Sequence, residues 1–301
     1  MKVVLTGGTG FVGQNLAIYL EQKNYEISSI SLREADWKKS FLLDAKAIIH
    51  LVGKAHDTSN NSDSDEYFRV NRDITIEVFN EFLISNIRDF FYFSSVKAVA
   101  DSVIDVLDEN KAASPLTPYG KSKIEAEEYL LNQKMPEGKR LFIIRPCMIH
   151  GPGNKGNLNL LYKIVEKGIP WPLASFHNNR SFLSIDNLSF LVEAMIQDIH
   201  LQSGIYNFAD DDPISTNELV TLIAEVLGRK GRLICISPAI VRFLAKIGDV
   251  IPFPLNSERL KKLTESYIVS NQRIKDALNI DSLPVSTKDG LENTIRSFRK
   301  D

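Results

Sequence analysis

The chain has 301 residues, with 36 Lys and Arg against 38 Asp and Glu, so its formal net charge is −2. Hydrophobic residues make up 44% and charged residues 25%, the balance of a globular protein that buries a sizeable core. This composition excludes a disordered chain and gives no basic footprint for nucleic acid. The two cysteines form neither a disulfide framework nor a metal-binding spacing.

Two stretches bear on the cellular location. Residues 1–5 run directly into a glycine-rich turn, so we expect no signal peptide. The apolar stretch 236–255 contains Arg242, Lys246 and Asp249 together with three prolines, and is too charged to span a bilayer. We therefore expect a cytoplasmic protein with neither a membrane nor a nucleic acid as partner.

In the first half of the chain, short apolar runs alternate with longer amphipathic stretches. The predicted strands are residues 2–5, 27–32, 47–52, 90–93 and 141–144. The predicted helices are residues 12–22, 65–85 and 118–132. Alternating strands and helices predict an α/β fold with a Rossmann-like, doubly wound parallel sheet.

Beyond Pro146 the sequence changes character, and turns rich in Gly and Pro recur. Residues 182–185 and 205–208 predict two strands that return to the main sheet. Residues 214–228 and 236–278 predict a smaller, mostly helical C-terminal substrate cap. The predicted domains are a dinucleotide-binding domain of residues 1–150 with 182–212, and a cap of residues 151–181 and 213–301.

Residues 6–13, Thr-Gly-Gly-Thr-Gly-Phe-Val-Gly, lie between the first predicted strand and the first predicted helix. They contain the G-x-G-x-x-G spacing. The glycines permit a tight turn, and they let the backbone approach a pyrophosphate at the helix N-terminus, where free N–H groups favour an anion. In this strand–turn–helix context the motif predicts a dinucleotide site.

The end of the second predicted strand bears on which dinucleotide binds. An acid there would bind the ribose hydroxyls of NAD, whereas an arginine would meet the 2′-phosphate of NADP. Ser31 stands near the acid's position and Arg33 follows it, which favours NADP. Glu34 could serve NAD if the strand ends later, so both cofactors stay open.

Ser95, Tyr119 and Lys123 form a candidate catalytic set. Ser95 follows the predicted strand 90–93, and Tyr119 and Lys123 are four residues apart at the start of the predicted helix 118–132. Moving a hydride at a sugar carbinol carbon requires a proton to leave or join its oxygen. Free tyrosine has a pKa of about 10, and a nearby lysine ammonium and an oxidised nicotinamide would lower it. Tyr119 is then the acid/base, Lys123 its partner and Ser95 the residue that positions the oxygen.

These motifs together resemble the extended short-chain dehydrogenase/reductase family, in its NAD(P)-dependent nucleotide-sugar epimerase/dehydratase branch. The resemblance is carried by residues 6–13, 50–53, 93–95, 119–123, 145–153 and 179–188, and so extends over nearly the whole chain. Residues 94–97 and 151–157 are similar to bacterial UDP-N-acetylhexosamine 4-epimerases and to the 4-keto reductases that make UDP-quinovosamine.

The resemblance implies a role for individual residues. The pyrophosphate would be held by Gly7, Gly10, Phe11, Val12 and Gly13. The remaining cofactor contacts would come from Arg33, Leu51, Val52, Gly53, Tyr119, Lys123 and Pro146. Asn157 and Leu158 would approach the uracil and Arg180 the diphosphate, with a second phosphate ligand among Arg259, Lys261 and Lys262. It also implies a nucleotide-sugar substrate, and relatives commonly form homodimers. The five histidines show no metal-ligand spacing, so we expect no metal.

Three functions compete with one another. In relatives that dehydrate their substrate an Asp-Glu pair follows the catalytic hydroxyl, whereas Val96 and Lys97 follow Ser95 here, so we do not expect dehydration. A 4-keto reductase using NADPH and a 4-epimerase holding NAD would need the same catalytic set. Arg33 favours the reductase. A non-catalytic dinucleotide sensor is the third alternative, although it would have no need of that set.

Overall fold

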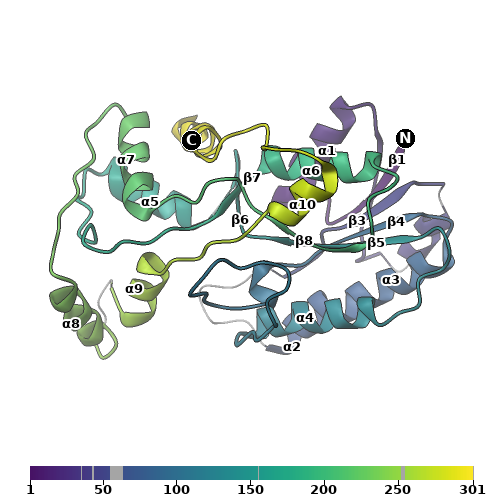
Figure 1. Cartoon of the computed structure of the whole chain (residues 1–301), viewed down its shortest axis with the longest axis horizontal. Helices are drawn as coiled ribbons and strands as arrows, with labels where there is room; N and C mark the ends of the chain where they lie inside the picture. Colours follow the sequence, from purple (N-terminus) through teal and green to yellow (C-terminus); the bar gives the residue numbers. More distant parts are fainter. Residues whose placement is uncertain (35, 43, 55–63, 155, 252–254, 301) are drawn as a thin grey trace.

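A parallel six-stranded sheet forms the centre of the protein (Figure 1). This computed structural model describes residues 1–34, 36–42, 44–54, 64–154, 156–251 and 255–300. The strands lie in the order β2-β1-β3-β4-β5-β8. Helices α1, α6 and α10 cover one face, and α2, α3 and α4 cover the other. The Rossmann-like α/β fold predicted from the sequence is confirmed.

The first half of the chain supplies most of this core. Its strands are β1 (Lys2–Thr6), β2 (Glu26–Ile30), β3 (Ala47–His50), β4 (Asp89–Phe93) and β5 (Arg140–Pro146). Its α-helices are α1 (Phe11–Gln22), α2 (Ser64–Phe68), α3 (Ile74–Ile84) and α4 (Pro118–Leu131). Shorter turns are the 3₁₀ turns η1 (Trp37–Leu42) and η3 (Val96–Ala98), and the π-helical turn η2 (Arg69–Asp73).

The second half adds three strands and seven α-helices among the described residues. The strands are β6 (Met148–His150), β7 (Phe182–Ser184) and β8 (Gly204–Phe208). The helices are α5 (Asn157–Glu166), α6 (Ile185–Gln197), α7 (Thr216–Val226), α8 (Pro238–Gly248), α9 (Ser257–Thr264), α10 (Gln272–Leu278) and α11 (Thr287–Ser297). A 3₁₀ turn, η4 (Phe298–Lys300), follows.

The central strands are apolar on both faces because helices cover both sides of the sheet. Val4, Ile48 and Phe90 stand beside one another in the register and face the α3–α4 side. Leu5, Ile49 and Phe91 alternate with them and face the α1–α6 side. Such uninterrupted apolar runs explain why these strands could be recognised from the sequence.

One predicted strand does not return to the main sheet. Residues 182–185 were expected there, but β7 pairs in parallel with β6 in a separate two-stranded sheet, with Met148 opposite Phe182. β8 takes the position next to β5, and the Cys147 amide continues that pairing by donating to the Phe208 carbonyl. The edge of β5 is therefore occupied, and Phe182 packs into a second apolar core.

This second core lies among α5, α7, α8, α9 and α11, at the left end of Figure 1. Trp171, Leu222 and Leu291 are among its buried side chains. The division into two domains stays a prediction. Part of the predicted cap segment 213–301 packs elsewhere, since Ile274 of α10 lies in the core of the main sheet. Within the described residues, no helix has the length and apolarity needed to cross a membrane.

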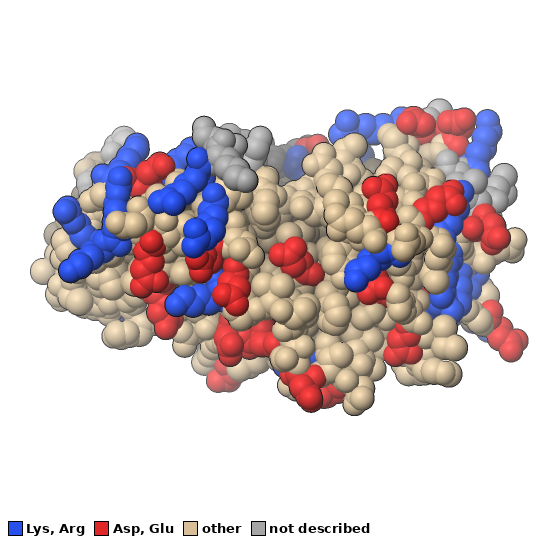
Figure 2. All heavy atoms as spheres, turned by 90° about the horizontal axis from the view of Figure 1, so that it is seen from above, with Lys and Arg blue, Asp and Glu red and all other residues tan. Residues whose placement is uncertain are grey.

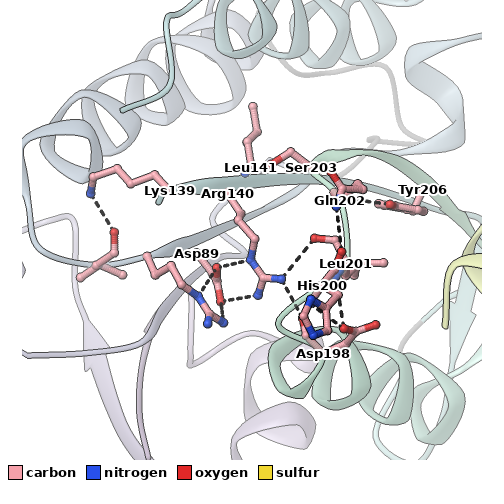
Figure 3. Close-up of polar contacts among 12 residues, drawn as sticks. Asp89, Lys139, Arg140, Leu141, Asp198, His200, Leu201, Gln202, Ser203 and Tyr206 are labelled. Carbon is pink, nitrogen blue, oxygen red and sulfur yellow. Dashed lines mark hydrogen bonds and ion pairs between the residues drawn. The ribbon is translucent and has the colours of Figure 1, made fainter. Parts of the chain in front are cut away.

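The amino-terminal edge of the sheet is held by a buried ion pair (Figure 3). Asp89, at the start of β4, is fully buried and accepts hydrogen bonds from Arg140 Nε and Nη2 at 2.7 and 2.9 Å. Arg140 Nη1 also donates to the carbonyls of Asp198 and Leu201. The pair thus ties β4 and β5 to the loop that follows α6.

Replacing Asp89 with Ala should lower the free energy of unfolding by about 3 kcal/mol, because it leaves the guanidinium of Arg140 buried without its carboxylate. Urea denaturation followed by circular dichroism measures this. Asp36→Ala is the matched control, since its carboxylate pairs with Lys39 at the surface and is worth less than about 1 kcal/mol. Equal losses in the two variants would contradict the prediction.

Candidate active site

The turn between β1 and α1 is built from close backbone contacts. Gly7 has φ +79°, and a Cβ there would lie 2.9 Å from the Val52 nitrogen. A Cβ on Gly13 would lie 2.4 Å from the Gly7 carbonyl oxygen. Only glycine fits either position.

The same turn leaves the N-terminus of α1 ready for an anion. Gly10 is the N-cap and has no side chain with which to cap the N–H groups that begin at Phe11 and Val12. The first turn carries no acidic residue. This cradle fits the pyrophosphate of a dinucleotide, as the glycine motif predicts.

The turn lies where the order of the sheet reverses, between β1 and β3. Leu51, Val52 and Gly53 follow β3 directly, and the first two contact Gly7 through their backbone. A Cβ on Gly53 would lie 3.1 Å from the Lys123 ammonium. Ligands of open α/β sheets bind at such a reversal, beyond the carboxyl ends of the strands. The structure therefore brings together the predicted cofactor residues of the first and third strands.

The other predicted cofactor residues lie along the same edge. β2 ends at Ile30, two residues before the predicted strand end, so Ser31 and Arg33 follow the strand. Arg33 is exposed. Pro146 is the last residue of β5 and is buried opposite Phe208.

Ser95 and Tyr119 meet at the carboxyl end of β4. Ser95 is buried and begins η3, with its hydroxyl accepting from the Lys97 amide at 3.2 Å. Tyr119 lies in the first turn of α4, which Thr117 caps by accepting from the Gly120 amide. Burial raises the pKa of Tyr119 and a hydrogen bond with Ser95 lowers it, with a net increase. The protein's own groups therefore do not give the lowered pKa predicted from the sequence.

Lys123 lies one turn further along α4 and is almost completely buried. Its ammonium donates to the Phe93 carbonyl at 2.8 Å and lies 5.0 Å from the centre of the Tyr92 ring. Burial lowers the pKa of Lys123 to about 8, and the carboxylate of Glu127 acts in the opposite direction. The lysine is thus a buried cation held against the ends of β3 and β4.

The group that fixes α4 against the sheet was not predicted from the sequence. Glu127 is fully buried, and both of its carboxylate oxygens accept from Arg145 Nε at 3.0 Å. Ser94, which precedes the catalytic candidate Ser95, donates to the same carboxylate. A sequence signal existed, since Glu127 stands four residues after Lys123 and so shares its helix face.

Asn71 was also missed. The predicted helix 65–85 is interrupted by the π-helical turn η2, and turns of this kind often occur at functional sites. Asn71 lies on this turn, fully buried, where it accepts from the Lys54 amide at 2.8 Å and donates to Ser122 Oγ at 3.1 Å. It therefore joins the loop after β3 to α4 beside Lys123.

The predicted substrate residues lie on the cap side. Asn157 begins α5, but its side chain is outside the described part of the structure. Leu158 is only 4% exposed in the cap core, so only its backbone could contact a uracil. The guanidinium of Arg180 is half-buried and donates to the Lys262 carbonyl near the end of α9.

The three cationic residues of α9 have different ion-pair and hydrogen-bond partners. Lys262 pairs with Glu258 at 2.6 Å and Lys261 with Glu265 at 3.9 Å, both at the surface. The Arg259 amide donates to Asn256 Oδ1, which caps the helix. No group of three or more His, Cys, Asp or Glu in the described ranges could hold a metal ion.

A further cation, which was assigned no role in the predictions from the sequence, follows the candidate Ser95 in the chain. Lys97 follows Ser95 by two residues, and its ammonium lies 4.1 Å from the centre of the Tyr267 ring. Burial lowers the pKa of Lys97 to about 8, and Arg180 and Lys261 are close enough to act in the same direction. The ammonium donates to the Asp101 carbonyl at 2.7 Å, and the carboxylates of Asp101 and Glu265 partly offset the burial, so Lys97 is a second buried cation near Arg180.

Comparison with known proteins assigns this site to a family. Residues 3–209 match the model of the NAD dependent epimerase/dehydratase family. The chain belongs to this family. It is 27% identical to UDP-glucose 4-epimerase of Vibrio cholerae, over 99% of this chain and 95% of that one. It is 26% identical to the N-acetyl-alpha-D-glucosaminyl-diphospho-ditrans,octacis-undecaprenol 4-epimerase of Escherichia coli O157:H7, over 98% and 94% of the two chains.

Solved structures of the epimerase/dehydratase fold match the whole chain. MoeE5, in complex with UDP-glucose and NAD, superposes with a TM-score of 0.78 and 16% identity, and the match covers 100% of this chain and 99% of that one. At this identity the match shows the fold alone. Family membership shows that the chain is an enzyme, which sets aside the non-catalytic sensor.

The buried ammonium of Lys123 should destabilise the enzyme. Because its folded pKa of about 8 lies below its ordinary value of 10.5, the cost is complete below pH 8 and disappears as the pH rises to 10.5. Lys123→Met should therefore raise the free energy of unfolding at pH 7 by about 2 kcal/mol while abolishing turnover.

Urea denaturation of nucleotide-stripped protein at pH 7 and pH 10 measures this gain, which should shrink at the higher pH. Lys121→Met, on the exposed side of α4, is the control and should change neither stability nor its pH dependence. A Lys123→Met protein less stable than wild type at pH 7 would show that the hydrogen bond to Phe93 outweighs the burial cost.

Proposed function

We propose that this enzyme catalyses NAD(P)-dependent oxidoreduction at C4 of a nucleotide sugar of the UDP-N-acetylhexosamine class. The observation that carries the proposal is the meeting of Ser95, Tyr119 and Lys123 at the carboxyl edge of the sheet, beside the glycine turn. An acid/base, an oxygen-positioning hydroxyl and a buried cation there are the groups that carbinol–ketone interconversion needs.

Each residue has a defined task. The Tyr119 hydroxyl gives or takes the proton of the C4 oxygen, and Ser95 holds that hydroxyl by its hydrogen bond. Lys123, with a pKa of about 8, is mostly protonated at neutral pH and supplies positive charge beside Gly53. When bound, the nicotinamide supplies or accepts the hydride, and its oxidised form adds the positive charge that favours the Tyr119 phenolate.

The substrate would lie between the sheet edge and the cap. Arg180, with the Lys97 ammonium close enough to interact with it, suits the diphosphate, since a guanidinium binds phosphate oxygens in pairs. The start of α5, at Asn157 and the Leu158 backbone, would contact the base. Both curated relatives named above are 4-epimerases by name, and their substrates share a sugar linked to a diphosphate.

Between the two C4 reactions, we propose 4-keto reduction with NADPH. Ser31 and the exposed Arg33 follow the end of β2, where a small hydroxyl and a positive charge would suit a 2′-phosphate. 4-Epimerisation with NAD is the second candidate, and the relatives' names favour it. A reductase must exchange its cofactor after each turnover, whereas an epimerase regenerates it within each cycle.

The nucleotide released when the purified enzyme is denatured separates these reactions. We expect little bound nucleotide, and NADP(H) where any is found, together with consumption of NADPH when a UDP-4-keto-hexosamine is added. Arg33→Ala should then weaken NADPH binding without weakening that of NADH. Release of close to one NAD(H) per chain would overturn the reductase assignment and establish the epimerase.

Tyr119→Phe tests the proposed chemistry itself. Loss of the hydroxyl should lower kcat by about 10²–10⁴-fold, since the proton of the C4 oxygen then has no carrier, while the Kd of the dinucleotide is retained. Tyr129→Phe, on the same helix but bonded to Asn80 at the surface, is the matched control and should keep full activity. A Tyr119→Phe enzyme with wild-type kcat would exclude this residue as the acid/base.

A further inference from the structure

The outer end of the cap exposes an unusual amount of apolar surface. Eighteen large hydrophobic side chains are exposed in the described part of the chain, and eight of them fall between residues 233 and 251. Four lie on α8, where Phe243 is 64% and Ile240 54% exposed, with Leu244 and Ile247 beside them. A concentration of this kind on one short segment marks a docking surface rather than the usual scatter of single residues.

Helix α8 divides into three sectors around its axis. Val241 and Ala245 are buried and fix the helix to the cap core. At 100° per residue, Ile240, Phe243, Leu244 and Ile247 form a second, exposed sector. Arg242 and Lys246, both exposed, form a third sector that lies between the buried sector and the exposed apolar sector. An apolar face bordered by cations is the arrangement of a helix that lies in a membrane interface.

The charge around α8 also favours contact with a membrane interface. Residues 226–248 contain five Lys and Arg and no Asp or Glu, although the whole chain has a net charge of −2. Those on the approach to α8 are Arg229, Lys230 and Arg232. Figure 2 shows further Lys and Arg side chains, with Asp and Glu among them, on the upper face of the same end of the molecule, the face opposite α8 in Figure 1. Cations at this density favour an anionic surface.

A second copy of the chain is a less suitable occupant. A two-fold symmetric contact through α8 would place the face of one copy on the same face of the other. Arg242 and Lys246 of both copies would then approach one another, which is unfavourable in an interface of low dielectric. Lipid phosphates instead complement these cations, and acyl chains complement the apolar sector.

We propose that α8, which we call the membrane-docking helix, holds the cap against the surface of an anionic lipid bilayer without crossing it. The apolar sector enters the boundary between head groups and acyl chains, while Arg242 and Lys246 bind lipid phosphates. α8 packs on α9 through the hydrogen bonds of Asp249 with Ser257, and α9 in turn accepts from Arg180. The proposed diphosphate end of the active site is therefore linked to the membrane-docking helix.

Co-sedimentation of the full-length enzyme with vesicles tests this directly. We expect binding to vesicles of phosphatidylglycerol and phosphatidylethanolamine, much less to phosphatidylcholine alone, and a loss of binding as salt is raised. The double variant Phe243→Ser/Ile247→Ser should lose about tenfold or more in partitioning, because it removes the centre of the apolar sector. Lys246→Glu should weaken binding to the anionic vesicles selectively.

Ile84→Ser is the matched control, because Ile84 is 82% exposed at the end of α3, away from the cap, and this variant should bind like wild type. Circular dichroism and turnover of a soluble substrate confirm that each variant is folded, and the vesicle measurement itself needs no turnover. Failure of the proposed function would thus leave this result unaffected. Wild-type protein that ignores anionic vesicles, or a double variant that binds them normally, would overturn the proposal. The proposal would also be overturned if sedimentation velocity showed that the wild-type protein is a dimer and the double variant a monomer.

Discussion

The carboxylate of Glu127 holds α4, the helix of Tyr119 and Lys123, on the sheet. It lies in the protein interior, where it accepts from Arg145 at the end of β5 and from Ser94 at the end of β4. A buried carboxylate is tolerated only when such partners surround it, so the three residues hold one arrangement of β4, β5 and α4. Since Lys123 and Tyr119 stand one and two turns before Glu127, their positions relative to Ser95 follow from this ion pair.

The sequence around the start of α4 completes that constraint. Thr117 caps the helix and Pro118 occupies its first position, which sets where the helix begins. Gly120 allows the closest approach, because a Cβ there would lie 2.4 Å from the Lys97 carbonyl oxygen. The segment after Ser95 can therefore rest directly on the first turn of α4, and Tyr119 meets Ser95 without a bulkier residue between them.

Prediction from the sequence succeeded where local rules decide the structure. The glycine turn, the apolar strands and the Tyr119–Lys123 pair each have a signal within a few residues. It failed where distant segments compete or meet. Whether β7 joins the main sheet depends on β8, which reaches the edge of β5 from 20 residues further along. Asn71, Lys97 and Arg145 gain their meaning only from partners far away in the chain, and no periodicity reveals those.

The two ends of the sheet use buried charge for different purposes. At the amino-terminal edge, the Asp89 carboxylate is satisfied by Arg140 and Arg88, so this ion pair resists separation of the strands (Figure 3). At the carboxyl edge, the Lys123 ammonium donates to the Phe93 carbonyl and forms no ion pair within the described part of the chain, and burial lowers its pKa accordingly. An ammonium neutralised by a carboxylate would have little effect on a neighbouring phenol, whereas one held by a carbonyl keeps its field. Under the proposed function, the incomplete pairing that destabilises Lys123 is what leaves its positive charge available to the reacting groups.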